Sequence, residues 1–388
     1  MKLLWGSPLP PVRSGVSDYA LEILEEIGAH TRVRVLEPPG WKRPEGWNLD
    51  AAVELVPGDT PPEDDEISLI HLGNNPHHLW LLDRLGGPRT VVVLHDLVLH
   101  HLLVEGAASR DEGAFLEERL RAAHGSAGEV LARARAVGLT GRLDPFLFPA
   151  RGVFLDQVAG VVVHSQWGET IVRGEWPGLE IGRVKLAVAD PGPADRTHER
   201  TRIGIADDDV VLMHLGFLTP EKGLVEILTG LAAAVLSGVQ ARLILVGEGV
   251  GLEDVVAAAA DAGVGDRVVS TGWVDPQSFP TVPAAADVGV VLRTPSAGET
   301  SAAALRFLAC GTPVAVGGLH QFLEWPERAA PRITPGSSTP AELARILAQA
   351  AQGGENWQQR RIAAREAYDD GHHPAAAAGE LIRFLERF

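Results

Sequence analysis

The stretch Pro295–Val314 places a carboxylate next to the expected beginning of a helix. Asp287–Arg293, just before it, is apolar and β-branched enough to be a buried strand. Thr300 or Ser301 suits the N-cap position of a helix that the Cys-Gly-Thr-Pro sequence ends. The pattern predicts a strand, a loop and a short helix, with Glu299 at the mouth of the helix.

This arrangement suits a phosphorylated sugar. A helix N-terminus presents unpaired N–H groups and partial positive charge, so it favours a phosphate. The carboxylate of Glu299 would accept hydrogen bonds from sugar hydroxyl groups. The alternative is an ordinary strand–helix unit whose acid only caps the helix, and these residues alone leave both interpretations open.

A second stretch of this kind begins with the apolar strand Val210–Leu215. A loop that holds Gly216 and Lys222 follows, and then a helical pattern. A lysine in such a loop can meet a diphosphate as a mobile point charge. The chain begins with the same plan, since a strand at Lys2–Gly6 precedes a loop with Gly15 and a helix. Each half therefore reads as a Rossmann-like domain.

Polar side chains follow two predicted strands in the first half of the chain. Asn74 and Asn75 come after one buried strand, and His95 and Asp96 come at the end of the next. Ligands of open α/β sheets bind at the carboxyl ends of strands. We therefore expect these four side chains to lie on the ligand side of the sheet.

Several histidines of the first half raise the question of a metal site: His71, His77, His78, His95, His100 and His101. No two of these histidines have the i,i+4 spacing beside a glutamate that zinc enzymes use, and no cysteine near them could serve as a further ligand. We expect no metal site. His100 and His101 are interpreted as part of a partly exposed helix face.

The elements that must position these residues alternate along the chain, which favours an α/β fold. A length of 388 residues exceeds one comfortable core and predicts two domains. Val184–Val188 is expected to be the last strand of the first domain, and Asp190–Arg202 has linker composition. Glu105–Pro149 is expected to be helical, either as a surface hairpin or as a source of acceptor contacts.

Composition excludes several classes of function. With 34 basic and 51 acidic residues the formal net charge is −17, which argues against nucleic acid and against tight docking on anionic lipid. The single cysteine, Cys310, rules out an intrachain disulfide. No apolar run reaches membrane-spanning length, so a cytoplasmic protein is expected. The sequence has no G-x-G-x-x-G, and no cofactor is predicted.

The sequence PSAGETSAAALRFLACGTPV resembles the donor-binding motif of glycosyltransferase family 4, the retaining GT-B enzymes. In that family one acid follows a Pro-Ser turn and contacts the transferred sugar, and a second acid holds the donor ribose. Glu299 matches the first acid. Arg306 stands near the place of the second, so this is a GETS-type variant and the ribose contact does not carry over.

Other loops carry the same resemblance. Gly15 matches a glycine that faces the donor diphosphate, and His95 matches a histidine that approaches the transferred sugar. Lys222 matches one of two cations on the leaving diphosphate, in a loop that begins at Gly216. The loops at Gly247 and Val274 are those that flank the base and ribose.

The second cation of the family pattern is replaced by Phe217. As a hypothesis, Arg293 at the end of the strand before the central motif supplies the missing charge. The alternative is a surface arginine at a strand end.

The resemblance implies a GT-B fold, in which two Rossmann-like domains face each other across a cleft. Residues 1–189 would form the acceptor-side domain, completed by a crossing helix in 366–388, and residues 190–365 the donor domain. The implied activity is metal-independent, retaining transfer of a hexose-type sugar from a nucleotide-diphosphate donor. The acceptor would be a glycan, a lipid-linked group or a small molecule.

Two other functions remain open at this point. A nucleotide-sugar epimerase of GT-B fold would need several acids for proton transfer, and Glu299 is the one good candidate. A non-catalytic GT-B partner subunit is compatible with the missing second acid and with Phe217.

Overall fold

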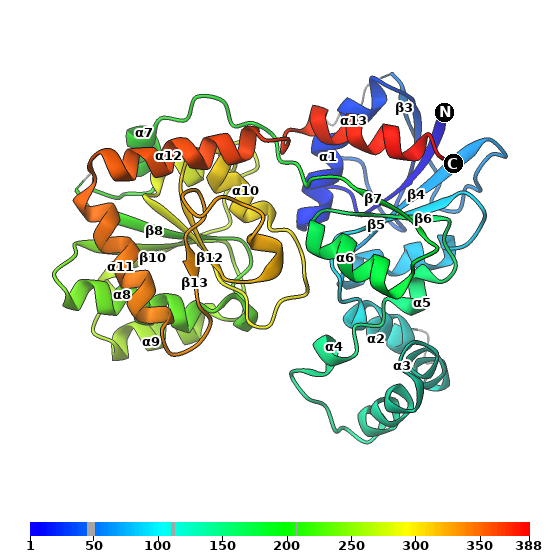
Figure 1. Cartoon of the computed structure of the whole chain (residues 1–388), viewed down its shortest axis with the longest axis horizontal. Helices are drawn as coiled ribbons and strands as arrows, with labels where there is room; N and C mark the ends of the chain where they lie inside the picture. The colour runs from blue at the N-terminus through cyan, green and yellow to red at the C-terminus, as the bar shows by residue number, and fades with distance from the viewer. Residues whose placement is uncertain (45–50, 110–112, 207) are drawn as a thin grey trace. The chain divides into compact units, whose positions relative to one another are not determined.

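The computed structural model describes residues 1–44, 51–109, 113–206 and 208–388. The chain forms two compact units, each an α/β unit built on a parallel sheet (Figure 1). Unit 1 comprises Met1–Ala187, Ala297–Thr300 and Pro374–Phe388, and unit 2 comprises Val188–Ser296 and Ser301–His373.

Unit 1 contains a seven-stranded sheet in the order β3-β2-β1-β4-β5-β6-β7, and every pairing in it is parallel. Its inner strands β1, β4, β5 and β6 are buried and mostly apolar, because helices cover both faces of such a sheet. The strands are β1 (Lys2–Gly6), β2 (Arg32–Leu36), β3 (Val53–Val56), β4 (Glu66–Leu72), β5 (Thr90–Leu94), β6 (Gly160–Val163) and β7 (Glu180–Arg183).

The last strand of unit 1 corrects the prediction for Val184–Val188. The strand that pairs with β6 is Glu180–Arg183, whose burial pattern has exposed ends. An edge strand needs no apolar run, so Glu180 and Arg183 face solvent and hid the strand in the sequence. Residues 184–188 lie outside any strand, although all of them except Lys185 are buried.

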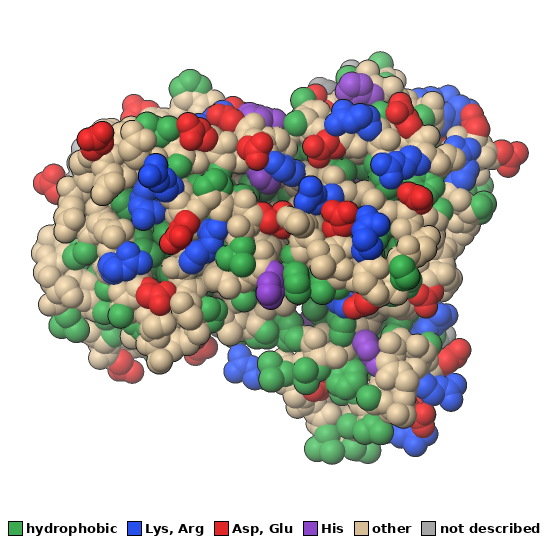
Figure 2. Space-filling model, in the orientation of Figure 1, with side chains coloured by type: hydrophobic (Ala, Val, Ile, Leu, Met, Phe, Trp, Pro, Cys, Tyr) green, Lys and Arg blue, Asp and Glu red, His purple; other side chains and the backbone are tan. Residues whose placement is uncertain are grey.

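The helices of unit 1 surround this sheet. They are α1 (Gly15–Gly28), η1 (Pro76–Arg84), α2 (His100–Ser109), α3 (Gly113–Ala136), α4 (Asp144–Leu147), α5 (Gly152–Leu155), α6 (Gln166–Glu175) and α13 (Pro374–Leu385). Within the predicted helical segment 105–149, helices occupy 105–109, 113–136 and 144–147, with a break at Gly125, where φ is 62°. Residues 110–112 of this segment lie outside the described residues. Figure 2 shows apolar side chains gathered on the surface of α3 and α4. Exposed large apolar residues of this part of the chain are Val130 of α3, Leu147 of α4, and Val137, Leu139 and Leu143 between the two helices.

The terminal helix α13 packs into unit 1 on strand positions that lack side chains. A Cβ atom at Gly182 would lie 2.6 Å from the Phe384 ring, and one at Gly160 would lie 2.3 Å from the ring of Phe388. Glycine at these two positions of β7 and β6 therefore makes room for the aromatic rings of the chain terminus.

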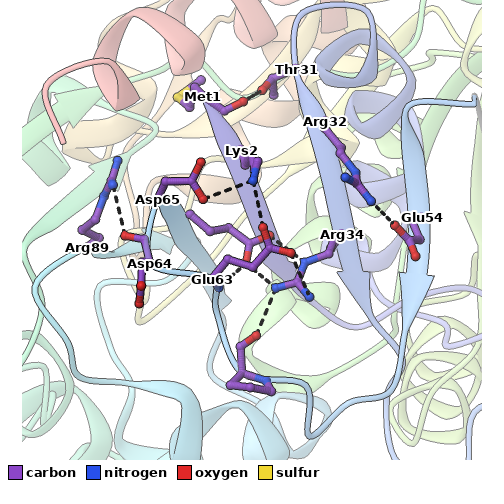
Figure 3. Close-up of polar contacts among 12 residues, drawn as sticks. Met1, Lys2, Thr31, Arg32, Arg34, Glu54, Glu63, Asp64, Asp65 and Arg89 are labelled. Atoms are coloured by element: carbon purple, nitrogen blue, oxygen red, sulfur yellow. Dashed lines mark hydrogen bonds and ion pairs between the residues drawn. The ribbon is translucent and has the colours of Figure 1, made fainter.

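Charged residues occupy the amino ends of the unit 1 strands (Figure 3). Lys2 bonds Glu63 at 2.9 Å, and the Arg34 Nε donates to Glu66 at 2.8 Å. Glu66 is buried, so its ion pair with Arg34 satisfies a carboxylate that would otherwise be costly. These ion pairs lie at the sheet edge opposite the one where ligands bind in such folds.

Unit 2 contains a six-stranded parallel sheet in the order β10-β9-β8-β11-β12-β13. Its strands are β8 (Val210–Leu215), β9 (Ala241–Val246), β10 (Val268–Gly272), β11 (Val288–Val291), β12 (Val314–Gly317) and β13 (Arg332–Ile333). Its helices are α7 (Arg196–Arg202), η2 (Pro220–Lys222), α8 (Leu224–Leu236), α9 (Leu252–Asp261), η3 (Gly265–Arg267), η4 (Val282–Ala285), α10 (Ala302–Ala309), η5 (His320–Phe322), α11 (Thr339–Gln352) and α12 (Gly354–Asp369).

Helix α7 corrects the prediction that all of 190–202 is a linker. Asp195 caps this helix by accepting from the backbone N–H groups of Thr197 and His198. Arg200 is 1% exposed and pairs with Asp287 at 2.7 Å. A buried pair of this kind anchors the helix to unit 2, which the polar composition of the segment did not reveal.

None of the helices in the described part of the chain is both long enough and apolar enough to cross a bilayer.

Candidate functional site

The loops after β8 and β11 bring two cationic residues to one edge of the unit 2 sheet. Strands β8 and β11 are parallel neighbours, so their carboxyl ends lie side by side. The backbone N–H of Thr294 donates to the carbonyl of Glu221 at 3.1 Å, which joins the two loops directly. Lys222 and Arg293 are the residues next to this hydrogen bond, so the structure brings them into one neighbourhood.

His214 in β8 reports the charge of this neighbourhood. It is 2% exposed, and burial lowers its pKa to about 3, with the nearby charges of Lys222 and Arg293 adding to the effect. An imidazole with such a pKa is neutral at pH 7. The strand end therefore holds two cations above a neutral ring.

Two glycines shape the backbone beside these cations. Gly216 and Gly247 have φ of 117° and 132°, in the region that favours glycine. A Cβ atom at Gly247 would lie 2.1 Å from the carbonyl oxygen of Gly216, so the loops after β8 and β9 touch. Val274, 9% exposed, follows β10, the next strand of the sheet. The predicted donor-side residues 216, 247 and 274 thus share one sheet edge with the cations.

The two positions that depart from the family pattern have different surroundings. Phe217 is 45% exposed in the loop after β8. Arg306 on α10 is 5% exposed, and its guanidinium lies 5.0 Å from the centre of the Phe279 ring. Near the position where the family pattern has its second acid, this chain thus has a buried cation stacked on an aromatic ring.

The loop that carries Glu299 leads into α10. Of the two predicted N-cap residues, Thr300 and Ser301, the structure has Ser301, whose hydroxyl accepts from the Ala304 N–H at 3.3 Å. Glu299 is 8% exposed. Residues 297–300 belong to unit 1, where the Leu97 N–H donates to the carbonyl of Ala297 at 2.7 Å. The loop therefore lies against the segment that follows β5.

A small recess of unit 1 opens beside this loop. Its lining includes His95 and His164 from the ends of β5 and β6, together with Thr300. The remaining lining residues are Leu94, Leu97, Val163, Ser165, Gly168 and Gly298. Thr300 and His95, two predicted site residues, thus line the same recess.

Three histidines at the ends of β4, β5 and β6 form a hydrogen-bonded cluster. The Nδ1 of His71 lies 2.9 Å from the Nε2 of His95, and the Nδ1 of His95 lies 3.3 Å from the Nε2 of His164. Tyr19 of α1 packs edge-on against His95 and His164, with ring centres 5.2 Å and 5.6 Å away. Burial lowers the pKa of His71 and of His95 well below the ordinary value, and the neighbouring histidines add to this. His71 and His95 are therefore neutral imidazoles at this strand edge.

The predicted acceptor-side residues come together and also cap helices. The Asn74 N–H donates to Asp96 Oδ2 at 2.7 Å, and the Asn74 side chain accepts from the His101 N–H at 2.9 Å at the start of α2. Asn75 caps η1 by accepting from the His77 N–H at 3.0 Å. These contacts order the loops between β4, β5 and α2.

Gly15 lies elsewhere in its segment than the sequence suggested. It is the first residue of α1 rather than a loop residue before the helix. Ser14 is the N-cap residue, and its hydroxyl accepts from the Ser17 N–H at 3.1 Å. Because Ser14 caps the helix, α1 begins before the first residue of its apolar periodic pattern.

Comparison with known protein families finds a match in the second half of the chain. Residues 209–352 match the family model of the glycosyl transferases group 1. The segment includes Lys222, Arg293 and Glu299, whereas His95 and Gly15 precede it.

Curated relatives extend the match. The chain is 28% identical over 241 residues to a 2-deoxystreptamine glucosyltransferase from Streptomyces kanamyceticus, covering 60% of this chain and 62% of that protein. It is 34% identical over 179 residues to a D-inositol 3-phosphate glycosyltransferase from Acidothermus cellulolyticus, covering 41% of this chain and 39% of that protein. These matches span less than two thirds of each relative.

Solved structures establish the fold along the whole chain. Sucrose-phosphate synthase from Thermosynechococcus elongatus superposes with a TM-score of 0.67 at 18% identity, covering 100% of this chain and 99% of that one. Anabaena Alr3699/HepE in complex with UDP and glucose has a TM-score of 0.63 at 18% identity, covering 100% of both chains. The chain thus has the GT-B fold that the sequence predicted.

His164 was not among the predicted site residues, and His71 was considered only as a possible metal ligand. His164 directly follows the apolar strand β6, in the same way that His95 follows β5. The rule that ligand residues gather at strand ends would have found it. Among the described residues, no group of three histidine, cysteine, aspartate or glutamate side chains has an arrangement suited to a metal ion.

Proposed function

We propose that this protein is a retaining glycosyltransferase that moves a sugar from a nucleotide-diphosphate donor to a hydroxylated acceptor. The observation that carries the proposal is that Lys222 and Arg293 lie in two hydrogen-bonded loops at one edge of the unit 2 sheet, within the segment that matches the group 1 family model. The cations follow neighbouring parallel strands, which is where open α/β sheets bind their ligands.

The chemical demand of the reaction is the charge of the leaving group. When the bond between the anomeric carbon and the donor oxygen breaks, negative charge develops on the diphosphate. Lys222 meets it as a point charge, and Arg293 offers several N–H donors in a fixed plane. Arg293 thereby supplies the charge that Phe217 does not. The backbone N–H groups at the start of α10 face the same kind of ligand, and no step needs a metal ion or a further cofactor.

Two further residues orient the sugar in this proposal. The buried carboxylate of Glu299 accepts hydrogen bonds from sugar hydroxyl groups. His95, which stays neutral, contacts the sugar without taking a proton. The acceptor oxygen bonds to the anomeric carbon on the face that the diphosphate leaves, and a diphosphate oxygen takes the acceptor proton. Orientation of this kind lowers the barrier by holding the reacting atoms together.

The names of the similar proteins narrow the first substrates to test. One similar structure holds UDP and glucose, and another is described as a complex with UDP-glucose. The curated relatives act on 2-deoxystreptamine or D-inositol 3-phosphate, which are both six-membered carbon rings bearing hydroxyl groups. We therefore propose UDP-glucose as donor and a cyclitol as acceptor.

A ligand screen tests the donor. UDP and UDP-glucose, and the corresponding guanosine and adenosine compounds, are added to the protein, and the unfolding temperature is measured. A ligand that binds only the folded state raises the unfolding temperature by mass action. At a ligand concentration of about a hundred times Kd, the free energy of unfolding increases by about 2.7 kcal/mol. The proposal fails if none of these nucleotides raises the unfolding temperature more than an unrelated control ligand does.

A transfer assay tests the reaction. The stabilising donor is incubated with myo-inositol, inositol 3-phosphate and 2-deoxystreptamine, and the anomeric configuration of the product is read by NMR. A product with the configuration of the donor supports the proposal, and an inverted product refutes the retaining assignment. Donor converted to its epimer without acceptor would show the isomerase instead. Binding with neither transfer nor hydrolysis would show a non-catalytic partner.

A further inference from the structure

The histidine cluster of unit 1 has a fixed hydrogen-bond direction. His164 is 7% exposed, and its Nδ1 lies 2.9 Å from the carbonyl oxygen of Val184. A carbonyl oxygen only accepts hydrogen bonds, so the Nδ1 of His164 carries the proton of this bond. We infer that this buried ring is neutral, which makes the Nε2 of His164 an acceptor.

The direction passes along the cluster ring by ring. Because the Nε2 of His164 accepts, the Nδ1 of His95 must donate to it. The Nε2 of neutral His95 is then an acceptor, and the Nδ1 of His71 donates to it. One carbonyl group therefore sets the tautomer of all three rings, each with its proton on Nδ1.

The far end of the cluster accepts no further proton easily. The Nε2 of His71 is buried without a hydrogen-bond partner. The His71 ring lies against Trp5, with ring centres 4.2 Å apart, and its exposed fraction is 0%. An added proton at this nitrogen would be a buried charge without a partner, which costs several kcal/mol. The other end of the cluster stops at a peptide carbonyl, which cannot pass a proton on.

We propose that His71 and His164 are positioning residues that hold the His95 ring in one orientation and in the Nδ1–H tautomer on the wall of the recess. His95 then serves the sugar as a fixed neutral surface and takes no part in proton transfer. The contact with the sugar rests on the proposed function, whereas the tautomer and the clamp rest on the hydrogen bonds alone. Tyr19 closes the cluster from α1 by packing on the same rings.

The arrangement predicts opposite rescue patterns at its two ends. At position 164 the side chain must accept from His95, and glutamine places an oxygen near the former Nε2, whereas asparagine places its amide near the former Nδ1. At position 71 the side chain must donate from the Nδ1 position, which asparagine can do and glutamine cannot. We therefore expect His164→Gln and His71→Asn to preserve the His95 tautomer, and His164→Asn and His71→Gln to disturb it.

The direct test uses the wild-type protein with isotope-labelled histidine. Long-range proton–nitrogen NMR at pH 7 identifies which ring nitrogen carries the proton, and single substitutions assign the signals. The inference predicts neutral His71, His95 and His164 with the proton on Nδ1. A His95 ring protonated on Nε2, or a doubly protonated ring in this cluster, would overturn it. This measurement needs no donor and does not depend on whether any variant folds.

Kinetics then tests the consequence for the reaction, provided that transfer is observed. Each variant is compared with its partner at the same position, so that loss of the ring is common to both. The expected result is a kcat at least about tenfold higher for His164→Gln than for His164→Asn, and for His71→Asn than for His71→Gln, with circular dichroism showing equal folding. Equal kcat within both folded pairs would refute the positioning role. Absence of transfer in the wild type together with the predicted tautomers would count against the proposed function and leave the clamp standing.

Discussion

Acidification is expected to destabilise the protein strongly between pH 6.5 and about 4, because several histidines are buried in the neutral form. Burial lowers the pKa of His78 from 6.5 to about 4 and that of His214 from 6.5 to about 3. In this window the unfolded chain binds protons that the folded chain excludes, so the free energy of unfolding falls as pH falls. The stability that these groups contribute is complete above pH 6.5.

The magnitude follows from the two pKa values. At pH 5 a histidine that titrates at 6.5 when unfolded and at about 4 when folded has lost about 2 kcal/mol of stabilisation. His214 loses about the same, so the two together give about 4 kcal/mol. The lowered pKa values of His71 and His95 act in the same direction. Since domains are stable by about 5–15 kcal/mol, the expected loss is a large share of the total.

Urea unfolding at pH 8, 7, 6 and 5, followed by tryptophan fluorescence, measures this loss. His78→Gln removes one buried titrating ring and is expected to flatten the pH dependence by about 2 kcal/mol between pH 8 and pH 5. His77→Gln, at the exposed neighbouring position, is the matched control and should leave the pH dependence as in the wild type. A wild-type stability that changes by less than about 1 kcal/mol between pH 8 and pH 5 would contradict the reasoning.

Substitutions at four other positions have expected outcomes. Lys222→Ala and Glu299→Ala should each reduce the initial rate of sugar transfer at least about tenfold, or ~1.4 kcal/mol of barrier, and wild-type rates in both would defeat the site assignment. Arg293→Ala should weaken UDP binding in calorimetry, with Arg293→Lys intermediate because one point charge replaces a planar group; unchanged affinity would remove Arg293 from the diphosphate site. Asp287→Ala should cost about 3–5 kcal/mol in urea unfolding, because Arg200 is left buried without its carboxylate, and a loss below about 1 kcal/mol would show that the pair is unimportant.

Matched controls keep these outcomes interpretable. Arg173 lies on the exposed side of α6 in an i,i+4 pair with Glu169, so Arg173→Ala removes a cation without touching either strand edge. It should leave transfer and UDP affinity unchanged and cost at most about 1 kcal/mol of stability. A comparable effect of Arg173→Ala on UDP binding would mean that net charge, rather than the position of Arg293, controls the affinity.

Buried strands such as β5, β6 and β8 could be read from the sequence because they are almost entirely apolar runs. β8 was predicted with the bounds Val210–Leu215 that the structure has. The strand β7 was not, because an edge strand has one side without a partner and tolerates Glu180 and Arg183. Helix α7 was hidden for another reason: its burial depends on the ion pair of Arg200 with Asp287, which are far apart in the sequence.

The candidate site was predictable where it depends on strand order and not where it depends on side-chain contacts. Each cation was placed at a strand end from local sequence, and the pairing of β8 with β11 then brought Lys222 and Arg293 together. The histidine cluster depends on the orientation of three rings and on the carbonyl of Val184, a residue that was assigned to a strand. Periodicity gives no information about the direction in which a ring nitrogen points.

The net charge of −17 does not conflict with an anionic donor, because the two act over different distances. At physiological ionic strength the field of exposed carboxylates is screened over about 8 Å, so the acidic surface as a whole contributes little at the strand edge. Lys222 and Arg293 act at contact distance beside a neutral His214, where screening is weaker. Raising the salt concentration should therefore weaken UDP binding in the wild type and have a smaller effect in Arg293→Ala, since one of the two local cations is gone. Calorimetry at low and high salt measures both, and a donor affinity that rises with salt in the wild type would show that repulsion by the acidic surface outweighs the local cations.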